Sequence, residues 1–143
     1  MAPNKALLVP VVALAAWTFV MWFWMYATRL PAIRAARMAL DSNAPRGEQM
    51  ATLPPRVRWK ADNYNHLFEQ PTLFYAVGVV VALVDDAARG PSLYLAWGYV
   101  LLRVAHSLLQ SLVNKIELRF VLFALSSLVL LALTVRTLVL LVA

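Results

Sequence analysis

The chain has 143 residues, of which 62% are hydrophobic and only 14% are charged. About a quarter of the residues in a soluble domain are charged, so this composition excludes an ordinary soluble domain and predicts a single membrane domain over residues 1–143. A net charge of +6 would also suit nucleic-acid binding, but the basic residues lie between apolar segments, and no nucleic-acid partner is expected. Because the chain contains no cysteine, it has no disulfide and no thiol nucleophile of its own.

Four segments are long and apolar enough to cross a bilayer, which takes about 20 helical residues. The first covers residues 7–28 and ends in aromatic residues typical of a membrane interface, which favours an uncleaved anchor over a signal peptide. The other segments cover residues 65–84, 93–113 and 120–143. Short links between spans predict an all-α integral membrane protein folded as an antiparallel four-helix bundle.

The long connection, residues 29–63, carries most of the positive charge. It contains seven Lys or Arg residues against three Asp or Glu, whereas the link at residues 85–91 has one arginine and two aspartates. Cytoplasmic loops are enriched in Lys and Arg. This bias predicts that the long loop and the link at residues 115–119 are cytoplasmic and that both termini are periplasmic.

Polar residues recur along the second span. Asp62, Asn65 and Glu69 follow one another at steps of three and four residues, which places them on one stripe of a helix. Pro71 has no backbone N–H and predicts a kink near Leu67. Ionisable groups at membrane depth usually face a functional interior. Hydrogen bonding between helices is the alternative explanation for Asn65 and Glu69.

The third span carries a second polar stripe. Arg103, His106 and Gln110 lie at i, i+3 and i+7, so one face of the helix holds all three. A charge pair between Arg103 and Glu69 explains Arg103 as well as a direct ligand role does. His106 has no second histidine at ligand spacing on its own span, so no metal site is expected.

The last span contains two arginines with different expectations. Arg119 opens the span, where it either anchors the helix at the interface or serves a site. Arg136 lies near the other end, where snorkelling toward water explains it without a function. The four spans bring one set of polar residues to the cytoplasmic half: Arg29 or Arg34, Asn63, Asn65, Glu69, His106, Gln110 and Arg119. This set suits a small zwitterionic anion whose carboxylates bind arginine and whose ammonium binds glutamate, with an apolar second substrate arriving from lipid.

The motifs of the second and third spans resemble those of a known family. Arg103-Val-Ala-His106 looks like the helix-three Arg-x-x-His motif of the membrane-associated proteins in eicosanoid and glutathione metabolism (the MAPEG family), and Arg119 follows at the family's spacing. The segment RVRWKADNYNHLFEQPTLF, residues 56–74, resembles the helix-two signature and is most similar to the bacterial branch, which implies a bacterial inner membrane. Gln110 replaces the tyrosine that the family most often has there.

The resemblance implies a homotrimer that holds glutathione between neighbouring subunits. Arg119 would stabilise the glutathione thiolate as the catalytic residue. The implied glutathione-binding residues are Arg29, Arg34, Asn63, Asn65, Glu69, Arg103, His106 and Gln110. Among these, Asn65 and Glu69 would bind the peptide and its amine, and His106 with Arg29 or Arg34 would hold the carboxylates.

The activity implied in this way is a glutathione-dependent transferase or peroxidase reaction on a lipophilic small molecule taken from membrane lipid. Two alternatives stay open. One is a non-catalytic lipid-binding or scaffold protein of the same fold. The other is a proton or ion relay that uses Glu69 and His106.

Overall fold

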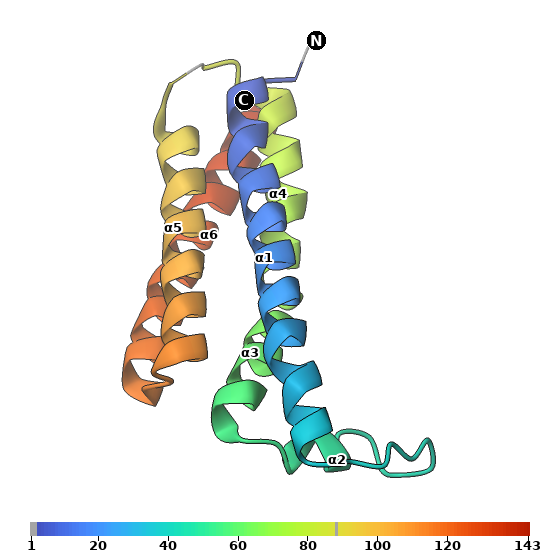
Figure 1. Ribbon diagram of the computed structural model, residues 1–143. Coiled ribbons are helices and arrows are strands. Elements are labelled where there is room, and N and C mark those ends of the chain that lie inside the picture. The colour runs from blue at the N-terminus through green and yellow to red at the C-terminus, as the bar shows by residue number, and fades with distance from the viewer. Residues whose placement is uncertain (1–2, 88) are drawn as a thin grey trace.

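A computed structural model describes residues 3–87 and 89–143, and every regular element within these residues is a helix. Four long helical segments run side by side along the molecule (Figure 1). They are α1 (Lys5–Ala35), α3 (Pro55–His66) continued by α4 (Pro71–Val84), α5 (Pro91–Leu112) and α6 (Ile116–Val142). Each segment is long and apolar enough to cross a membrane, so the predicted all-α, four-span membrane fold is confirmed.

Three of the four helical segments, all but α5, are longer than the predicted spans at the end that carries the long connection. α1 continues to Ala35, and the second segment begins at Pro55, where a proline suits the first turn because its missing N–H has no helical partner there. Hydropathy marks only the part of a helix that is apolar, and polar turns extend a helix without changing that signal. The connection between α1 and α3 holds one short helix, α2 (Glu48–Ala51).

The kink predicted near Leu67 is a complete break between α3 and α4. α3 ends at His66, four residues form a turn, and α4 begins at Pro71. Within the turn, the Leu67 N–H donates to the Asn63 carbonyl and the Glu69 N–H donates to the His66 carbonyl. Because Glu69 lies in the turn, it does not continue a helical stripe with the residues of α3, and the predicted common stripe is wrong at this position.

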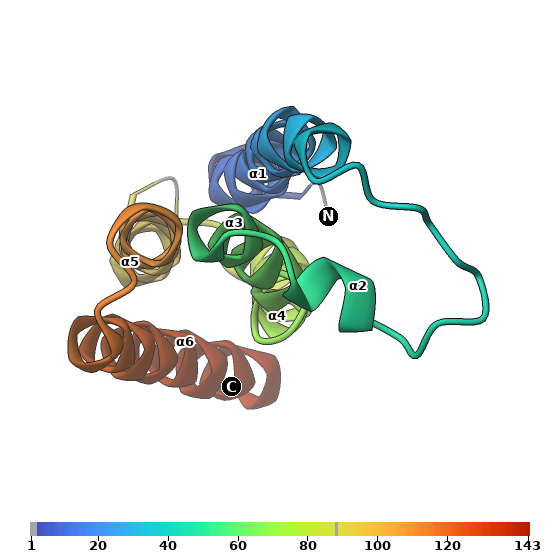
Figure 2. The same ribbon diagram turned by 60° about the horizontal axis from the view of Figure 1, so that its bottom comes forward.

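Two views locate the helices relative to one another. α5 packs along α6, and α1 contacts α3, α4 and α5 (Figures 1 and 2). Both termini lie at the same end of the bundle as the link between α4 and α5, which we call the terminal end. The opposite end, called the loop end, holds α2 and the turn between α5 and α6.

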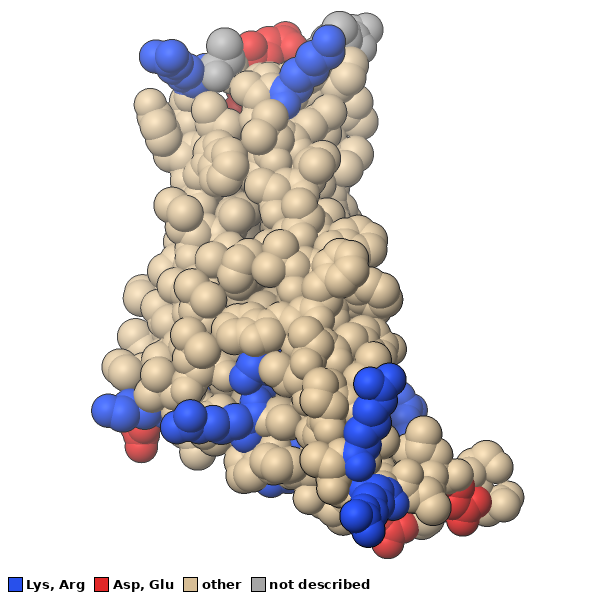
Figure 3. Space-filling model, viewed as in Figure 1, with Lys and Arg blue, Asp and Glu red and all other residues tan. Residues whose placement is uncertain are grey.

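Basic side chains gather at the loop end, as the blue surface in Figure 3 shows. The few charged side chains at the terminal end include both signs. This distribution is the basis of the prediction that the loop end is cytoplasmic, and the orientation stays a prediction.

The buried side chains differ in polarity between the two ends of the bundle. An apolar core fills the part nearer the terminal end, where the rings of Phe74 and Tyr99 stack with centroids 4.6 Å apart. Nearer the loop end, the buried side chains are mostly polar: Lys60, Asn63, Arg103, His106, Ser107, Gln110 and Ser111. Burying polar groups costs free energy unless they find partners, so this half of the bundle is the place to look for function.

Gly78 brings α4 close to α1. A Cβ atom at this position would lie 2.6 Å from Cγ2 of Val11, whereas a Cβ at Gly98 would meet its nearest neighbour at 3.8 Å. Small residues let membrane helices approach closely. Gly78→Ala is therefore expected to destabilise the protein by about 1–3 kcal/mol through overpacking, measured as a lower midpoint of thermal unfolding in detergent. Gly98→Ala is the matched control and should leave the midpoint unchanged or slightly higher; equal effects of the two changes would contradict the prediction.

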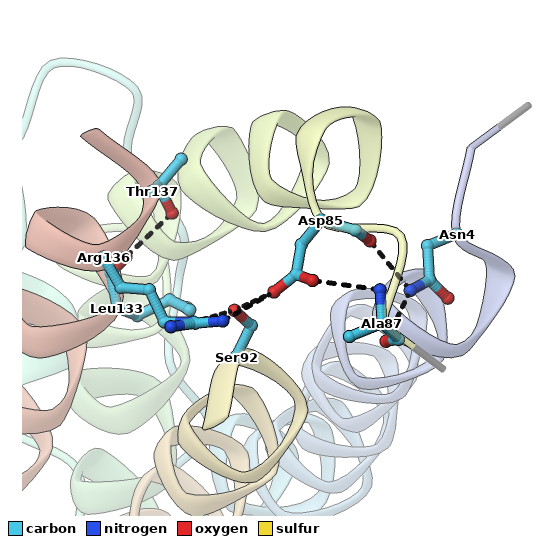
Figure 4. Close-up of polar contacts among 7 residues, drawn as sticks. All are labelled: Asn4, Asp85, Ala87, Ser92, Leu133, Arg136 and Thr137. Carbon is cyan, nitrogen blue, oxygen red and sulfur yellow. Dashed lines mark hydrogen bonds and ion pairs between the residues drawn. The ribbon is translucent and has the colours of Figure 1, made fainter. Parts of the chain in front are cut away.

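A polar cluster at the terminal end joins the start of α1, the link after α4, α5 and α6 (Figure 4). The Asp85 carboxylate accepts hydrogen bonds from the Ser92 hydroxyl and the Ala87 N–H, and it pairs with Arg136 Nη2 at 3.3 Å. Arg136 Nε donates to the Ser92 hydroxyl oxygen at 2.6 Å. The Asn4 side-chain amide donates to the carbonyls of Asp85 and Ala87, which fastens the start of α1 to this link. The sequence predicted that Arg136 snorkels toward water. Its side chain instead binds Ser92 and Asp85 in this cluster.

Burial of Asp85 would raise the pKa of its carboxyl group, but the hydrogen bonds from Ser92, Ala87 and Arg136 outweigh that effect and hold the pKa below its ordinary value of 3.8. The cluster therefore favours a charged Asp85.

Candidate functional site

A groove opens between α3, α5 and α6 at the loop end, with a volume of about 380 Å³. Its polar lining consists of His66 from α3, His106 from α5 and Arg119 from α6. Its apolar lining is Ile116, Phe120 and Phe123, all on α6. The groove thus combines a cation and two imidazoles with a hydrophobic wall.

A hydrogen bond to the turn that precedes α6 holds the Arg119 side chain in place. Its Nη1 donates to the Asn114 side-chain oxygen at 2.6 Å. Asn114 has φ of 56°, a left-handed conformation that asparagine tolerates at the end of a helix, and this conformation directs the chain from α5 into α6. The Nε atom of Arg119 is buried and has no hydrogen-bond partner among the described residues. Arg119 therefore lies in the groove with hydrogen-bonding capacity left for a ligand.

The predicted stripe on α5 faces the interior. Arg103, His106 and Gln110 are 1%, 2% and 3% exposed, so one face of the helix buries all three. Arg103 donates a long hydrogen bond of 3.4 Å to the His66 carbonyl. No ion pair between Arg103 and Glu69 occurs among the described residues, so the structure gives no support to that alternative.

Arg103 is a buried guanidinium with unused donors. Its Nε and Nη1 have no hydrogen-bond partner among the described residues, and its Cζ lies 6.0 Å from the centroid of the Phe123 ring. A buried charge without a counter-charge is costly unless an anion balances it. Arg103 and Arg119 together therefore make this end of the bundle favourable for a negatively charged group.

Asn63 connects helices and does not line the groove. Its amide nitrogen donates to the Ser107 hydroxyl oxygen, which also accepts a 3.0 Å hydrogen bond from the Trp17 indole N–H. This set joins α1, α3 and α5 through one serine. Trp17 was not predicted to be a contact residue, because nothing in the local pattern indicates its bond to a residue 90 positions away.

Arg29 and Asn65 lie in a second pocket, which we call the side cleft. Arg58 and Asp62 line it with them, together with residues in and beside α2, and its volume is about 240 Å³. The side cleft and the groove have no lining residue in common. Arg34 is exposed near the end of α1 and lines neither. A single chain therefore does not bring all the predicted binding residues together.

His66 was not among the predicted site residues, although it is central to the groove. Its Nδ1 is 2.6 Å from Oε2 of Glu69, and its ring centroid is 5.1 Å from that of His106 and 5.6 Å from that of Phe123. The His-x-x-Glu spacing of His66 and Glu69 is visible in the sequence, but the spacing alone does not show that the ring lines a groove with Arg119. Within the described residues, no group of three His, Cys, Asp or Glu side chains is arranged to hold a metal ion.

These observations define an integral membrane protein of four helical spans with an electropositive groove at its loop end. The chain belongs to the MAPEG family, whose sequence profile matches residues 7–139. Membership associates it in general with the membrane proteins of eicosanoid and glutathione metabolism. Comparisons with curated proteins and with solved structures give no significant match.

Proposed function

We propose that this protein binds glutathione at the groove and joins its thiol sulfur to a lipophilic electrophile, or uses its thiol to reduce a lipid peroxide. The observation that carries the proposal is the position of Arg119 in a groove that is polar on the α3 and α5 side and apolar along α6. The polar side suits the peptide thiol, and the apolar side suits a second substrate that arrives from the membrane. The chain has no cysteine, so the reacting sulfur must come from a bound thiol.

Arg119 would act by stabilising the thiolate. A free thiol has a pKa of about 8.5, so only a small fraction is ionised at neutral pH. An adjacent guanidinium typically lowers the pKa of an acidic group by about one to three units, and an arginine keeps its positive charge at neutral pH. The hydrogen bond from Arg119 to Asn114 holds this charge in the groove. The thiolate would then attack the electrophile and form the carbon–sulfur bond.

The separation of the groove from the side cleft supports a site shared between subunits. Glutathione carries two carboxylates and an ammonium group, and Arg29 and Asn65 suit these charged ends, but both lie in the side cleft. In a homotrimer, the groove of one subunit would receive the thiol while the side cleft of a neighbour binds the peptide. The predicted cytoplasmic position of the loop end, in a bacterial inner membrane, would give both pockets access to soluble glutathione.

Glutathione is expected to stabilise the purified protein in detergent. A ligand present at a hundred times its Kd stabilises the folded state by about 2.7 kcal/mol. The measurement is the midpoint of thermal unfolding with increasing glutathione, and the control is the same titration with the tripeptide lacking the sulfhydryl group, which should bind more weakly. A midpoint that stays unchanged up to the highest glutathione concentration would contradict the proposal and favour a lipid-binding or scaffold role. A relay through Glu69 and His106 predicts instead a pH-dependent ion flux into liposomes without glutathione.

A further inference from the structure

His66 and Glu69 form a pair in which a mostly buried imidazole, 20% exposed, contacts a carboxylate side chain that is 67% exposed. His66 ends α3 and lines the groove, and Glu69 follows it in the turn before α4. Glu69 lies in the turn before Pro71, three residues after His66, and its carboxylate reaches the ring. The 2.6 Å distance between Nδ1 and Oε2 is short enough for a charge-assisted hydrogen bond.

This hydrogen bond determines which nitrogen of His66 carries hydrogen. A carboxylate only accepts hydrogen bonds, so Nδ1 must be the donor, and the lone pair of the neutral ring is then on Nε2. Nδ1 is the only ring nitrogen of His66 with a hydrogen-bond partner among the described residues. An imidazole oriented through Nδ1 by a carboxylate has the arrangement of a general base.

Charged and titratable groups surround the ring from each packed element. Glu69 contacts it from the turn, Arg103 and His106 face it from α5, and Arg119 shares the groove from α6. A thiol placed beside Arg119 is therefore in the same groove as the His66 side chain. Arg119 can stabilise a thiolate but cannot accept its proton, because a guanidinium has no acceptor atom.

We propose that His66 is the general base that removes the thiol proton and that Glu69 is the positioning residue that orients it. This inference rests on the proposed function and assigns a step that Arg119 cannot perform. The S–H bond of glutathione breaks, its electron pair stays on sulfur, and the proton moves to Nε2. The product is a thiolate beside Arg119 and an imidazolium hydrogen-bonded to Glu69. After sulfur has attacked the electrophile, the imidazolium returns its proton to the leaving group or to water.

The test uses two variants and two ligands with the full chain in detergent. His66→Asn keeps an N–H near the position of Nδ1 but has no basic nitrogen, and Glu69→Gln keeps a hydrogen-bond acceptor but has no charge. Tyr64→Phe is the matched control on α3. Glutathione has a proton to lose, whereas S-methylglutathione does not. The rate of thiolate formation is followed by its ultraviolet absorption after rapid mixing, and binding is followed by thermal stabilisation.

His66→Asn is expected to slow thiolate formation by at least about a hundredfold, the lower end of the usual contribution of a general base, and Glu69→Gln to slow it less. The rate in His66→Asn should rise with hydroxide across the whole pH range, while the wild-type rate levels off once His66 is neutral. S-methylglutathione should stabilise both variants as it stabilises the wild type. Where His66→Asn does not fold, His66→Gln replaces it in the same measurements.

Each other outcome has a definite meaning. A wild-type rate and pH profile in His66→Asn would overturn the role of His66 while leaving the proposed function intact. Weaker binding of S-methylglutathione to Glu69→Gln would show that Glu69 binds the amine, as the family resemblance implies, and would overturn its positioning role. A wild-type protein that neither ligand stabilises would overturn the proposed function, and this inference with it.

Discussion

Replacing Arg119 by alanine is expected to lower the rate of glutathione conjugation by about 10- to 30-fold at neutral pH. The physical reason is the thiolate fraction: without the guanidinium, the thiol pKa returns toward about 8.5, a change of about one to three units. The same loss should move the pH profile of the reaction to higher pH, because thiolate forms in the variant only as the solution approaches the free thiol pKa. The measurement is the initial rate with a model electrophile in detergent across a range of pH.

Lys115→Ala is the matched control for Arg119→Ala. Lys115 immediately precedes α6, four residues before Arg119, and is exposed, but it does not line the groove, so its removal changes the local charge without touching the proposed site. Its conjugation rate should stay near that of the wild type, and both variants should keep the wild-type elution volume in size-exclusion chromatography. If Arg119→Ala keeps both the wild-type rate and the wild-type pH profile, Arg119 does not stabilise the thiolate.

The four membrane spans could be predicted from the sequence because each depends on a local property. An apolar run of about 20 residues specifies a span wherever the rest of the chain lies. The break at Pro71 was also predictable in kind, since proline cannot donate a hydrogen bond to the carbonyl of Leu67. The effect of this break on Glu69 was not predictable. A helix that continues through a kink would keep Glu69 on the stripe with Asp62 and Asn65, whereas the observed turn removes Glu69 from that stripe.

The site was predictable only one helix at a time. Spacing placed Arg103, His106 and Gln110 on one face of α5, and that face is buried. Spacing within a helix does not determine its rotation relative to its neighbours, so it could not separate the groove with Arg119 from the side cleft with Arg29. Contacts between residues far apart in the sequence could not be predicted from local sequence patterns either.

Arg136 and Asp85 are 51 residues apart in sequence, and their contact leads to the largest expected effect on stability. Asp85→Asn should destabilise the protein by about 2–3 kcal/mol, because it leaves a partly buried guanidinium without its counter-charge. The value lies at or below the lower end of the range for a fully buried pair, since the Arg136 side chain is 33% exposed and the Asp85 side chain 6%. Asp86→Asn is the adjacent control on an exposed aspartate and should change the free energy of unfolding by less than about 0.5 kcal/mol.

The pH dependence of this effect has a definite sign. The folded-state pKa of Asp85 is lowered from 3.8, so the charged carboxylate stabilises the protein above that pH and the contribution disappears as pH falls through the lower, folded-state value. The difference in unfolding midpoint between the wild type and Asp85→Asn should therefore be constant from about pH 7 to about pH 5 and shrink below pH 4. Adding Arg136→Met to Asp85→Asn should recover part of the lost stability, because removing both members of a buried pair costs less than removing one. The prediction is contradicted if Arg136→Met lowers the stability of Asp85→Asn by as much as it lowers the stability of the wild type. The two side chains would then act independently, and the terminal-end cluster would owe its stability to Ser92 and Asn4.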